Sequence, residues 1–547
     1  MIVNIFRPDY NGNNYKCRIA VSLFRCVRRK KGHIWQNIRL RVQRSWGGVG
    51  TSTAGFIGLA EKGPTAGTPV LITSFAEYQR RFGSYLSPQR YGSNRFLPNA
   101  VEHFFTNGGN TCYVMRVVPE DSTRATVTQG RFTFTAKDPG EWGNQLSIVI
   151  TADSKSKSQV QSVAGKADDA CTAELPVLNV VVSHGSITET YSGCTLNPDS
   201  SDYLITRLQL SQLVTVTAEP ADQSQKDSQS ASLASLGETD NSLTLQLSGG
   251  TDGTLPHPAA SLYKGSAAIP GLPTGLAAFT ELFDVNIMAI PGVTDQDVQA
   301  ALIAHCETMG NRLAVLDTPQ DKVNIVSLTA FRSVYDSSYA AMYAPWIKVF
   351  DPLCNQSVLQ PPSGAVCGIY ARSDTQRGVH KAPANEVVRG CTGLSANYNT
   401  AEQAKLNPIG INLIRSIPGQ GTRLWGARTC SNDGKWKYVN VRRLFFFLEQ
   451  SIRAHTNWVA SELNDESLWT RVKGTITMFL EAQRRNGSLA GSMPDQAYYV
   501  NVGTDTMTQN DILNGQLICE IGVAPVRPSE FVVFRITQRT QINTQHC

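Results

Sequence analysis

Strand-like and helix-like segments alternate in two separated parts of the chain, and this alternation restricts the possible folds more than any other feature. In the first part, Thr53–Ala60 and Thr111–Val118 are predicted strands, and a helix is predicted near Ala100–Asn107. Between them, Ser74 is a predicted N-cap with Glu77 three residues on, a spacing typical of a capping box. Alternating strands and helices favour a mostly parallel sheet with helices on its faces.

The same alternation returns at Leu282. The segment "FDVNIMAIPG" predicts a buried strand, "TDQDVQAALIAHCETMG" predicts a helix capped at Thr294 and ended at Gly310, and "RLAVLDTP" predicts the next strand. One more strand is predicted at Trp346–Phe350. Because β-α-β connections place their strands parallel and close together, we expect both parts to build one α/β domain.

The segment between these two parts has a different composition. It is rich in Ser, Thr, Gln and Asp, and short β-like runs such as "FTFTA", "LSIVIT" and "SLTLQLSGG" predict an inserted β-rich domain. We therefore predict a multidomain protein of α/β and α+β class. Its predicted parts are an atypical basic segment (1–46), the first part of the α/β domain (47–118), the insert (119–265), the second part of the α/β domain (266–384) and a C-terminal α+β domain (385–547).

Charge is unevenly distributed along the chain. Residues 1–45 hold eleven of the 50 Lys and Arg residues and one of the 44 acids, so the remaining chain holds 39 basic and 43 acidic residues. A mildly acidic body disfavours direct nucleic-acid binding. Three interpretations of the first segment stay open: a basic arm that binds an acidic surface, an extension without a fold, or a wrongly assigned start or reading frame.

Membrane, metal and redox signals are weak. No apolar run approaches the roughly 18 to 20 residues of a spanning helix, so we expect no membrane insertion. The twelve cysteines form no CxxC pair and no zinc-like cluster with histidine, which favours reduced thiols. The Ser/Thr-rich insert could belong to an adhesin-like module, but that would need export, and no secretory signal is recognisable.

The segment "WKYVNVRRLFFFLEQSIR", Trp436–Arg453, predicts an amphipathic helix that continues to about Leu463. Apolar residues recur every three or four positions, which places them on one helical face. Arg442, Arg443 and Glu449 are predicted to lie mostly off that face. Two alternatives stay open, because the face could pack within its own domain or partly against another subunit. The predicted packing residues are Leu444, Phe445, Phe446, Phe447 and Leu448.

Sequence signals for chemistry are absent or weak. No intact GxxxxGK[ST], GxSxG, HExxH or EF-hand motif occurs, so we predict no catalytic residue, no cofactor and no metal. The alternative is an α/β enzyme that binds a nucleotide or a metal at its strand ends. In that case Asp284, Asp317 and Asp351 are the candidate metal ligands.

Two C-terminal features suggest binding to other proteins. The predicted helix Leu468–Arg485 carries four basic residues, which form either a solvated face or a docking strip for an acidic partner. They are Arg471, Lys473, Arg484 and Arg485. The last β-prone run, Glu530–Thr537, lies close to the end of the chain, where a strand can be donated to a neighbouring sheet.

Several stretches, taken in order, resemble the contractile tail sheath proteins of phages and related bacterial injection systems. The resemblance covers about 47–118 and 280–540. Its most characteristic segments are "GVGTSTAGFIGLAEKGP", "AVEHFFTNGGNTCYVMRVV", "SSYAAMYAPWIKVFDP", "LNPIGINLIRSIPGQGTRLWGART", "WKYVNVRRLFFFLEQSI" and "GQLICEIGVAPVRPSEFVVFRITQ".

This resemblance implies a structural protein without an active site. It would polymerise as stacked rings around an inner tube, remain metastable while extended, and contract to drive the tube through a target envelope. Its partners would be further copies of itself, the tube protein, and baseplate and tail-terminator or cap proteins. Assembly in the bacterial cytoplasm, into either a phage tail or an injection particle, is implied as well.

The resemblance also assigns roles to residues. The C-terminal domain would face the tube through the helix Leu468–Arg485, and its sheet would receive terminal arms from neighbouring subunits. The donated C-terminal strand would be Phe531, Val532, Val533, Phe534, Arg535 and Ile536. Residues 1–46 lack the Pro-Gly-Val-Tyr-like arm usual in this family, so either the N-terminal arm is unusual here or the segment is out of frame and not native.

Overall fold

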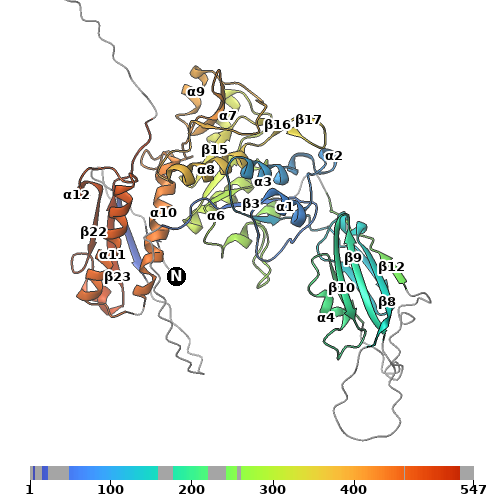
Figure 1. Cartoon of the computed structure of the whole chain (residues 1–547). Coiled ribbons are helices and arrows are strands. Elements are labelled where there is room, and N and C mark those ends of the chain that lie inside the picture. Colours follow the sequence, from blue (N-terminus) through green and yellow to red (C-terminus); the bar gives the residue numbers. More distant parts are fainter. Residues whose placement is uncertain are drawn as a thin grey trace, which may run out of the picture. The chain divides into compact units, whose positions relative to one another are not determined.

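The chain forms two compact units in the computed structural model (Figure 1). One unit comprises residues 51–372 and 384–426, and the other comprises 1–50, 373–383 and 427–547. The structure describes residues 4–5, 15–21, 48–157, 176–219, 242–254, 260–460 and 462–529.

A nine-stranded sheet forms the centre of the first unit, and six consecutive strands within it are parallel. This is the α/β core that the alternating sequence predicts. The strand order is β18 (Glu386–Val387), β21 (Gly421–Leu424), β20 (Ile411–Ile417), β15 (Ala340–Ala344), β14 (Leu313–Asp317), β13 (Ile287–Ala289), β3 (Ala54–Gly58), β5 (Cys112–Arg116) and β4 (Val70–Ile72).

The inner strands are short and almost wholly apolar. Every residue of β3, β14 and β15 is buried, as expected for strands covered on both faces. The helices that accompany them are α1 (Phe75–Phe82), α3 (Leu97–Thr106), α6 (Gln296–Met309), α7 (Ile325–Arg332), α8 (Ser363–Arg377) and α9 (Thr400–Leu406). A separate small sheet consists of β17 (Gln356–Gln360), β16 (Ile347–Asp351) and β19 (Gly393–Leu394).

Helix ends follow the predicted signals with two local differences. The Ser74 side chain accepts a hydrogen bond from the backbone N–H of Glu77, as predicted, but the Glu77 carboxylate bonds to Thr73 instead of closing the box. The predicted N-cap Thr294 is wrong by one residue, because Asp295 caps α6. Gly310 ends that helix in the left-handed conformation, as glycine does readily.

The insert is a β-sandwich with its own hydrophobic core. One antiparallel sheet has the order β10 (Ile187–Cys194), β9 (Pro176–His184), β8 (Ser147–Lys157) and β12 (Ser242–Gln246). The other has the order β11 (Val214–Ala218), β7 (Phe132–Ala136) and β6 (Thr126–Gln129). Alternate residues of β7 are buried, which is the pattern of a strand with one face on a core. The predicted β-rich character of this segment is confirmed.

The second unit packs two long helices and a sheet around one core. The helices are α10 (Val439–Thr456) and α11 (Glu466–Arg485), and the antiparallel sheet has the order β1 (Asn4–Ile5), β2 (Tyr15–Val21), β23 (Leu517–Val523) and β22 (Tyr498–Val502). The sequence predicts that this helix continues to about Leu463, but α10 ends at Thr456 and a 3₁₀ turn follows at Asn457–Val459. None of the described helices combines the length and apolar character needed to span a bilayer.

The predicted boundary at 385 falls at a different place in the structure. Residues 384–426 belong to the first unit, because β20 pairs with β15 and β21 extends the sheet beyond it. Local sequence patterns do not reveal which sheet a strand joins.

Candidate functional site

The three consecutive phenylalanines of α10 each pack within their own unit. Phe445 lies edge-on to Trp436 with ring centroids 4.9 Å apart, and Phe446 lies beneath the Arg442 guanidinium, which is 4.9 Å from its ring. Phe447 packs against Phe479 of α11, with ring centroids 6.0 Å apart. The flanking Leu444 and Leu448 are both buried in the core that α10 and α11 share. Each of these aromatic side chains thus has a partner within the same chain.

The arginines of α10 correct a prediction. Arg442 and Arg443, expected mostly off the apolar face, are both buried, with 4% and 3% of their surface exposed. Arg443 forms a bidentate ion pair with Asp374 in the last turn of α8, with nitrogen–oxygen distances of 2.9 and 2.6 Å. Arg442 stacks 4.4 Å from the Trp436 ring. A planar guanidinium can be buried this way because it pairs in a fixed geometry and stacks on aromatic rings.

Glu449 was also predicted off the apolar face and is partly buried. Burial raises its pKa to about 7, while the nearby Arg442 and Arg453 oppose that shift. Its Oε1 atom is shielded from solvent and has no hydrogen-bond partner among the described residues. The face of α10 is therefore broader and more polar than its apolar spacing indicates.

The four basic residues of α11 do not form one continuous strip. Successive helical residues rotate by about 100°, so Arg471 and Lys473 lie at opposite edges of the exposed face. Arg471 pairs with Glu462 at 3.6 Å and stacks 4.4 Å from the Trp458 ring. Lys473 is exposed.

The other two basic residues share one carboxylate. Arg484 and Arg485 both donate hydrogen bonds to Glu481, and these bonds lower the pKa of Glu481 to about 2. Arg484 also donates to the Ser492 carbonyl at 2.9 Å. Arg484 therefore helps to hold its own unit together, whereas Lys473 is available to a partner.

The centre of the exposed face of α11 carries small side chains and one large apolar side chain. Thr470 and Gly474 are exposed, and Met478 is 52% exposed. A Cβ atom added at Gly474 would meet nothing within 4 Å. Glycine in a helix interior costs about 1 kcal/mol relative to alanine, so packing inside the subunit does not explain this residue.

The sheet of the second unit includes a strand that the sequence did not predict. All seven residues of β2 pair antiparallel with β23, from Tyr15 opposite Val523 to Val21 opposite Leu517. In "YKCRIAV" Tyr, Cys, Ile and Val occupy every second position, and this period-two signal could have revealed the strand. The predicted donated strand Phe531–Ile536 lies outside the described residues.

The three aspartates of the enzyme hypothesis each have a separate structural role. Asp317 accepts hydrogen bonds from the Gly292 amide and from the amide and hydroxyl of Ser363, and burial raises its pKa to about 6. Asp284 accepts from the Tyr113 hydroxyl at 2.9 Å, and Asp351 accepts from a backbone amide two residues on. Within the described residues no group of three or more His, Cys, Asp or Glu side chains could hold a metal.

A pocket of about 590 Å³ lies beyond the carboxyl ends of β13 and β14, where α/β sheets commonly bind ligands. Its lining includes Tyr263, Asp295, Asp321 and Trp346, and it contains no Lys or Arg. The Asp295 carboxylate also occupies the first free amides of α6. The pocket therefore lacks the positive charge and the free helix N-terminal amides that commonly hold a phosphate group.

Two family models match adjoining parts of the chain. The phage tail sheath protein central domain matches residues 265–430, and the phage tail sheath C-terminal domain matches residues 431–539. A putative prophage major tail sheath protein from Pseudomonas aeruginosa is 25% identical over 299 residues, which are 53% of this chain and 75% of that protein. The tail sheath protein of Escherichia phage P2 is 22% identical over 48% of this chain and 66% of that protein.

Solved structures share the fold over most of the chain. The contracted helical sheath of the anti-feeding prophage has a TM-score of 0.54 at 21% identity, covering 93% of this chain and all of that chain. The contracted sheath of the extracellular contractile injection system PVC has a TM-score of 0.53 at 20% identity, with 93% and 99% covered. A sheath tail protein from Listeria innocua has a TM-score of 0.54 at 13% identity, with 83% and 89% covered.

Proposed function

Because this chain belongs to the contractile tail sheath family, in which its role is structural, we propose that it polymerises around an inner tube in an extended state and contracts to drive that tube outward. The observation that carries this proposal is the unbroken match of the two sheath domains over residues 265–539. That range holds the second half of the α/β core and most of the C-terminal unit.

We propose that strand exchange links the subunits. The support is the seven-residue pairing of β2 with β23, through which a segment near one end of the chain completes a sheet near the other end. In the polymer, β2 of one subunit would pair with β23 of the next, and Phe531–Ile536 would add a further strand.

The proposed tube-facing surface is the exposed face of α11. Its centre at Thr470, Gly474 and Met478 allows close approach, and Arg471 and Lys473 lie at its edges. Positive charge at the rim of a flat surface suits an acidic partner and guides its orientation. Arg485 extends the charged rim beyond Glu481, while Arg484 has mainly an internal role.

Membership of this family also suggests further binding partners and the place where the polymer assembles. Baseplate proteins would bind the first ring and a terminator or cap protein the last, and assembly would take place in the bacterial cytoplasm. The product would be a phage tail or a contractile injection particle, because a phage tail sheath protein is similar in sequence and injection-system sheaths share the fold. We assign no catalytic role to the α/β core, because its strand-end aspartates are engaged in structural hydrogen bonds.

Electron microscopy of the purified protein tests this function. We expect negatively stained samples to contain hollow helical tubes or stacked rings, formed by the protein alone or together with its tube protein. If only small uniform particles form, with the tube protein present and across a range of salt concentrations, the sheath function is wrong.

A further inference from the structure

The insert and the α/β core meet through polar groups. The hydrophobic core of the insert is formed by buried residues between Ala125 and Leu247, and no described residue of the α/β core belongs to it. Hydrogen bonds and ion pairs join the two parts. An example is Arg81 of α1, which donates to the Gln212 side chain at 2.6 Å. The orientation of the insert thus depends on a few directional contacts.

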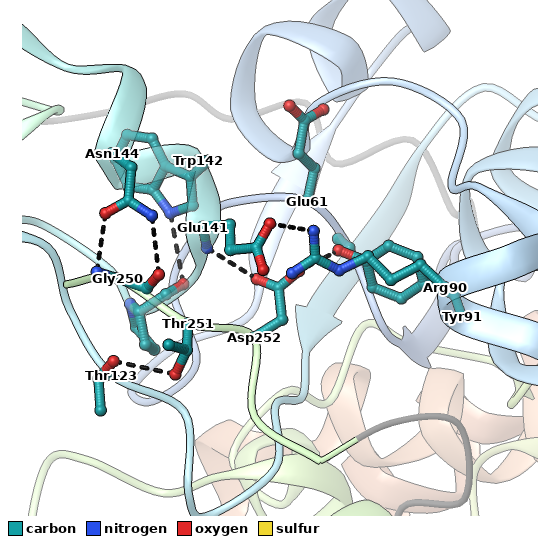
Figure 2. Close-up of polar contacts among 12 residues, drawn as sticks. Glu61, Arg90, Tyr91, Thr123, Glu141, Trp142, Asn144, Gly250, Thr251 and Asp252 are labelled. Atoms are coloured by element: carbon teal, nitrogen blue, oxygen red, sulfur yellow. Dashed lines mark hydrogen bonds and ion pairs between the residues drawn. The ribbon is translucent and has the colours of Figure 1, made fainter. Parts of the chain in front are cut away.

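Asp252 lies at the centre of these contacts, on the segment that leaves the insert (Figure 2). Its Oδ2 accepts from the Tyr91 hydroxyl at 2.5 Å and lies 2.9 Å from Arg90 Nη2, and both residues belong to α2 (Pro88–Tyr91) of the core. Its Oδ1 accepts from the Glu141 amide of the insert at 3.0 Å. One buried carboxylate therefore joins both parts, and Arg90 also pairs with the Glu141 side chain.

A buried arginine supports the same junction from the core. Arg116, at the end of β5, is 1% exposed. Its guanidinium donates to the carbonyls of Ala60, Glu61 and Gly63 in the core and to the carbonyl of Pro139 in the insert. These bonds satisfy a charge that would otherwise be costly to bury, because a desolvated guanidinium needs acceptors around it.

The two chain segments that connect the insert to the core are bonded to each other. Thr123 on the outgoing segment and Thr251 on the returning segment exchange backbone hydrogen bonds of 3.1 and 3.2 Å, and their hydroxyls lie 2.9 Å apart (Figure 2). Asn144 forms two 2.8 Å bonds with the backbone of Gly250. Antiparallel bridges at Thr123–Thr251 and Thr126–Ser248 therefore link the two connecting segments, which resist rotation better than two independent linkers.

We infer that Asp252, Arg90, Tyr91 and Glu141 form a clamp that locks the inserted β-sandwich onto the α/β core in one orientation. The insert then presents its outer surface as a fixed feature of each subunit and moves with the core as one body. This property belongs to the single subunit and does not depend on the proposed polymer.

Hydrogen exchange of the full-length unassembled protein tests the clamp, with Asp252→Asn as the main variant. We expect exchange of the amides at 120–126, 141 and 248–254 to accelerate about tenfold to hundredfold, the change that corresponds to one lost charge-assisted hydrogen bond. The sandwich strands at 147–152 and 178–184 should keep their protection. Small-angle scattering of the same variant should show a broader distribution of intramolecular distances.

Two further variants keep the test decisive. Tyr91→Phe removes only the hydroxyl and should give a smaller change of the same kind, while Asp199→Asn, an exposed charge elsewhere on the insert, should give none. The double variant Arg90→Ala/Asp252→Asn should lower the free energy of local opening at the junction by less than the sum of the two single variants, because both residues belong to the same contact. Unchanged exchange at the junction in Asp252→Asn and Tyr91→Phe, or equal loss of protection throughout the sandwich, would overturn the clamp.

Discussion

Arg443 and Asp374 form a bidentate ion pair in which both side chains are 3% exposed, and this pair fastens α10 to the last turn of α8. The relationship joins residues 69 positions apart and lies inside the C-terminal unit. Burying two charges is favourable only when they are paired and hydrogen-bonded, so each partner depends on the other.

Arg443→Ala should destabilise the C-terminal unit by about 3 to 5 kcal/mol, because it leaves the Asp374 carboxylate buried without its counter-charge. Urea unfolding followed by tryptophan fluorescence measures this, since Trp436, Trp458 and Trp469 all belong to that unit. Arg471→Ala, which breaks an exposed pair, should cost less than about 1 kcal/mol. A similar small cost for both variants would show that the buried pair contributes little.

Ile19→Pro should block polymerisation and leave the subunit folded. Proline removes a backbone donor from the middle of β2, where Ile19 pairs with Cys519, and it interrupts the ladder with β23. Negative-stain electron microscopy counts the tubes, and Ile19→Thr is the matched control because threonine favours strands. Tubes of normal length from Ile19→Pro would contradict a role for β2 in assembly.

A deletion of 529–547 should also prevent polymerisation, because it removes the proposed donated strand Phe531–Ile536. The monomer should keep its circular dichroism spectrum, since β22 and β23 precede the deletion. Normal tubes from this truncation would refute C-terminal strand donation while leaving the test of β2 unaffected.

Gly474→Ala and Gly474→Trp should separate folding from tube binding. Alanine should stabilise α11 by about 1 kcal/mol, because nothing within 4 Å opposes a Cβ atom there. Tryptophan should leave the subunit folded but weaken its association with the tube, measured by co-sedimentation.

Lys473→Glu should weaken the same association more at low salt than at high salt, since exposed charges are screened. If Gly474→Trp and Lys473→Glu both co-sediment with the tube as the unmodified protein does, the tube contact lies elsewhere.

Acidification should destabilise the α/β core through His103. This residue is buried, its ring nitrogens have no partner among the described residues, and burial lowers its pKa to about 4. The folded state therefore prefers the neutral ring, and the unfolded chain binds the proton more readily. The contribution of His103 to the free energy of unfolding is fully present above about pH 6.5. It falls by about 3 kcal/mol as the pH decreases to 4.

His103→Leu should flatten this pH dependence when the free energy of unfolding is measured between pH 4 and pH 7. His305, whose pKa is also lowered to about 4, remains in the variant and should preserve a second, similar slope. Asp317 acts in the opposite direction, because its raised pKa makes the folded state lose stability as the pH rises toward 6. An identical pH profile with and without His103 would contradict the assignment.

The sequence predicts a structural element correctly where the signal for that element is local. The Ser74 cap, the left-handed stop at Gly310 and the buried strand of Leu313–Asp317 depend on neighbours a few residues away, and the structure has all three. The β-rich insert also followed from composition and period-two alternation. The strand Tyr15–Val21 is absent from the predicted elements although its residues alternate, because the segment around it is rich in basic residues and lacks a clear period.

Only the tertiary structure decided the environment of charged residues and the assignment of strands to sheets. Helical spacing places Arg443 off the apolar face of α10, and its burial depends on Asp374, a residue on another helix. Likewise, nothing in the segment around Asp252 indicates that its carboxylate joins Arg90, Tyr91 and the Glu141 amide. Local sequence determines which elements form, because backbone preferences and side-chain periodicity act over a few residues. Long-range pairing decides which charges are buried, because a partner distant in sequence must offset the cost of removing each charge from water.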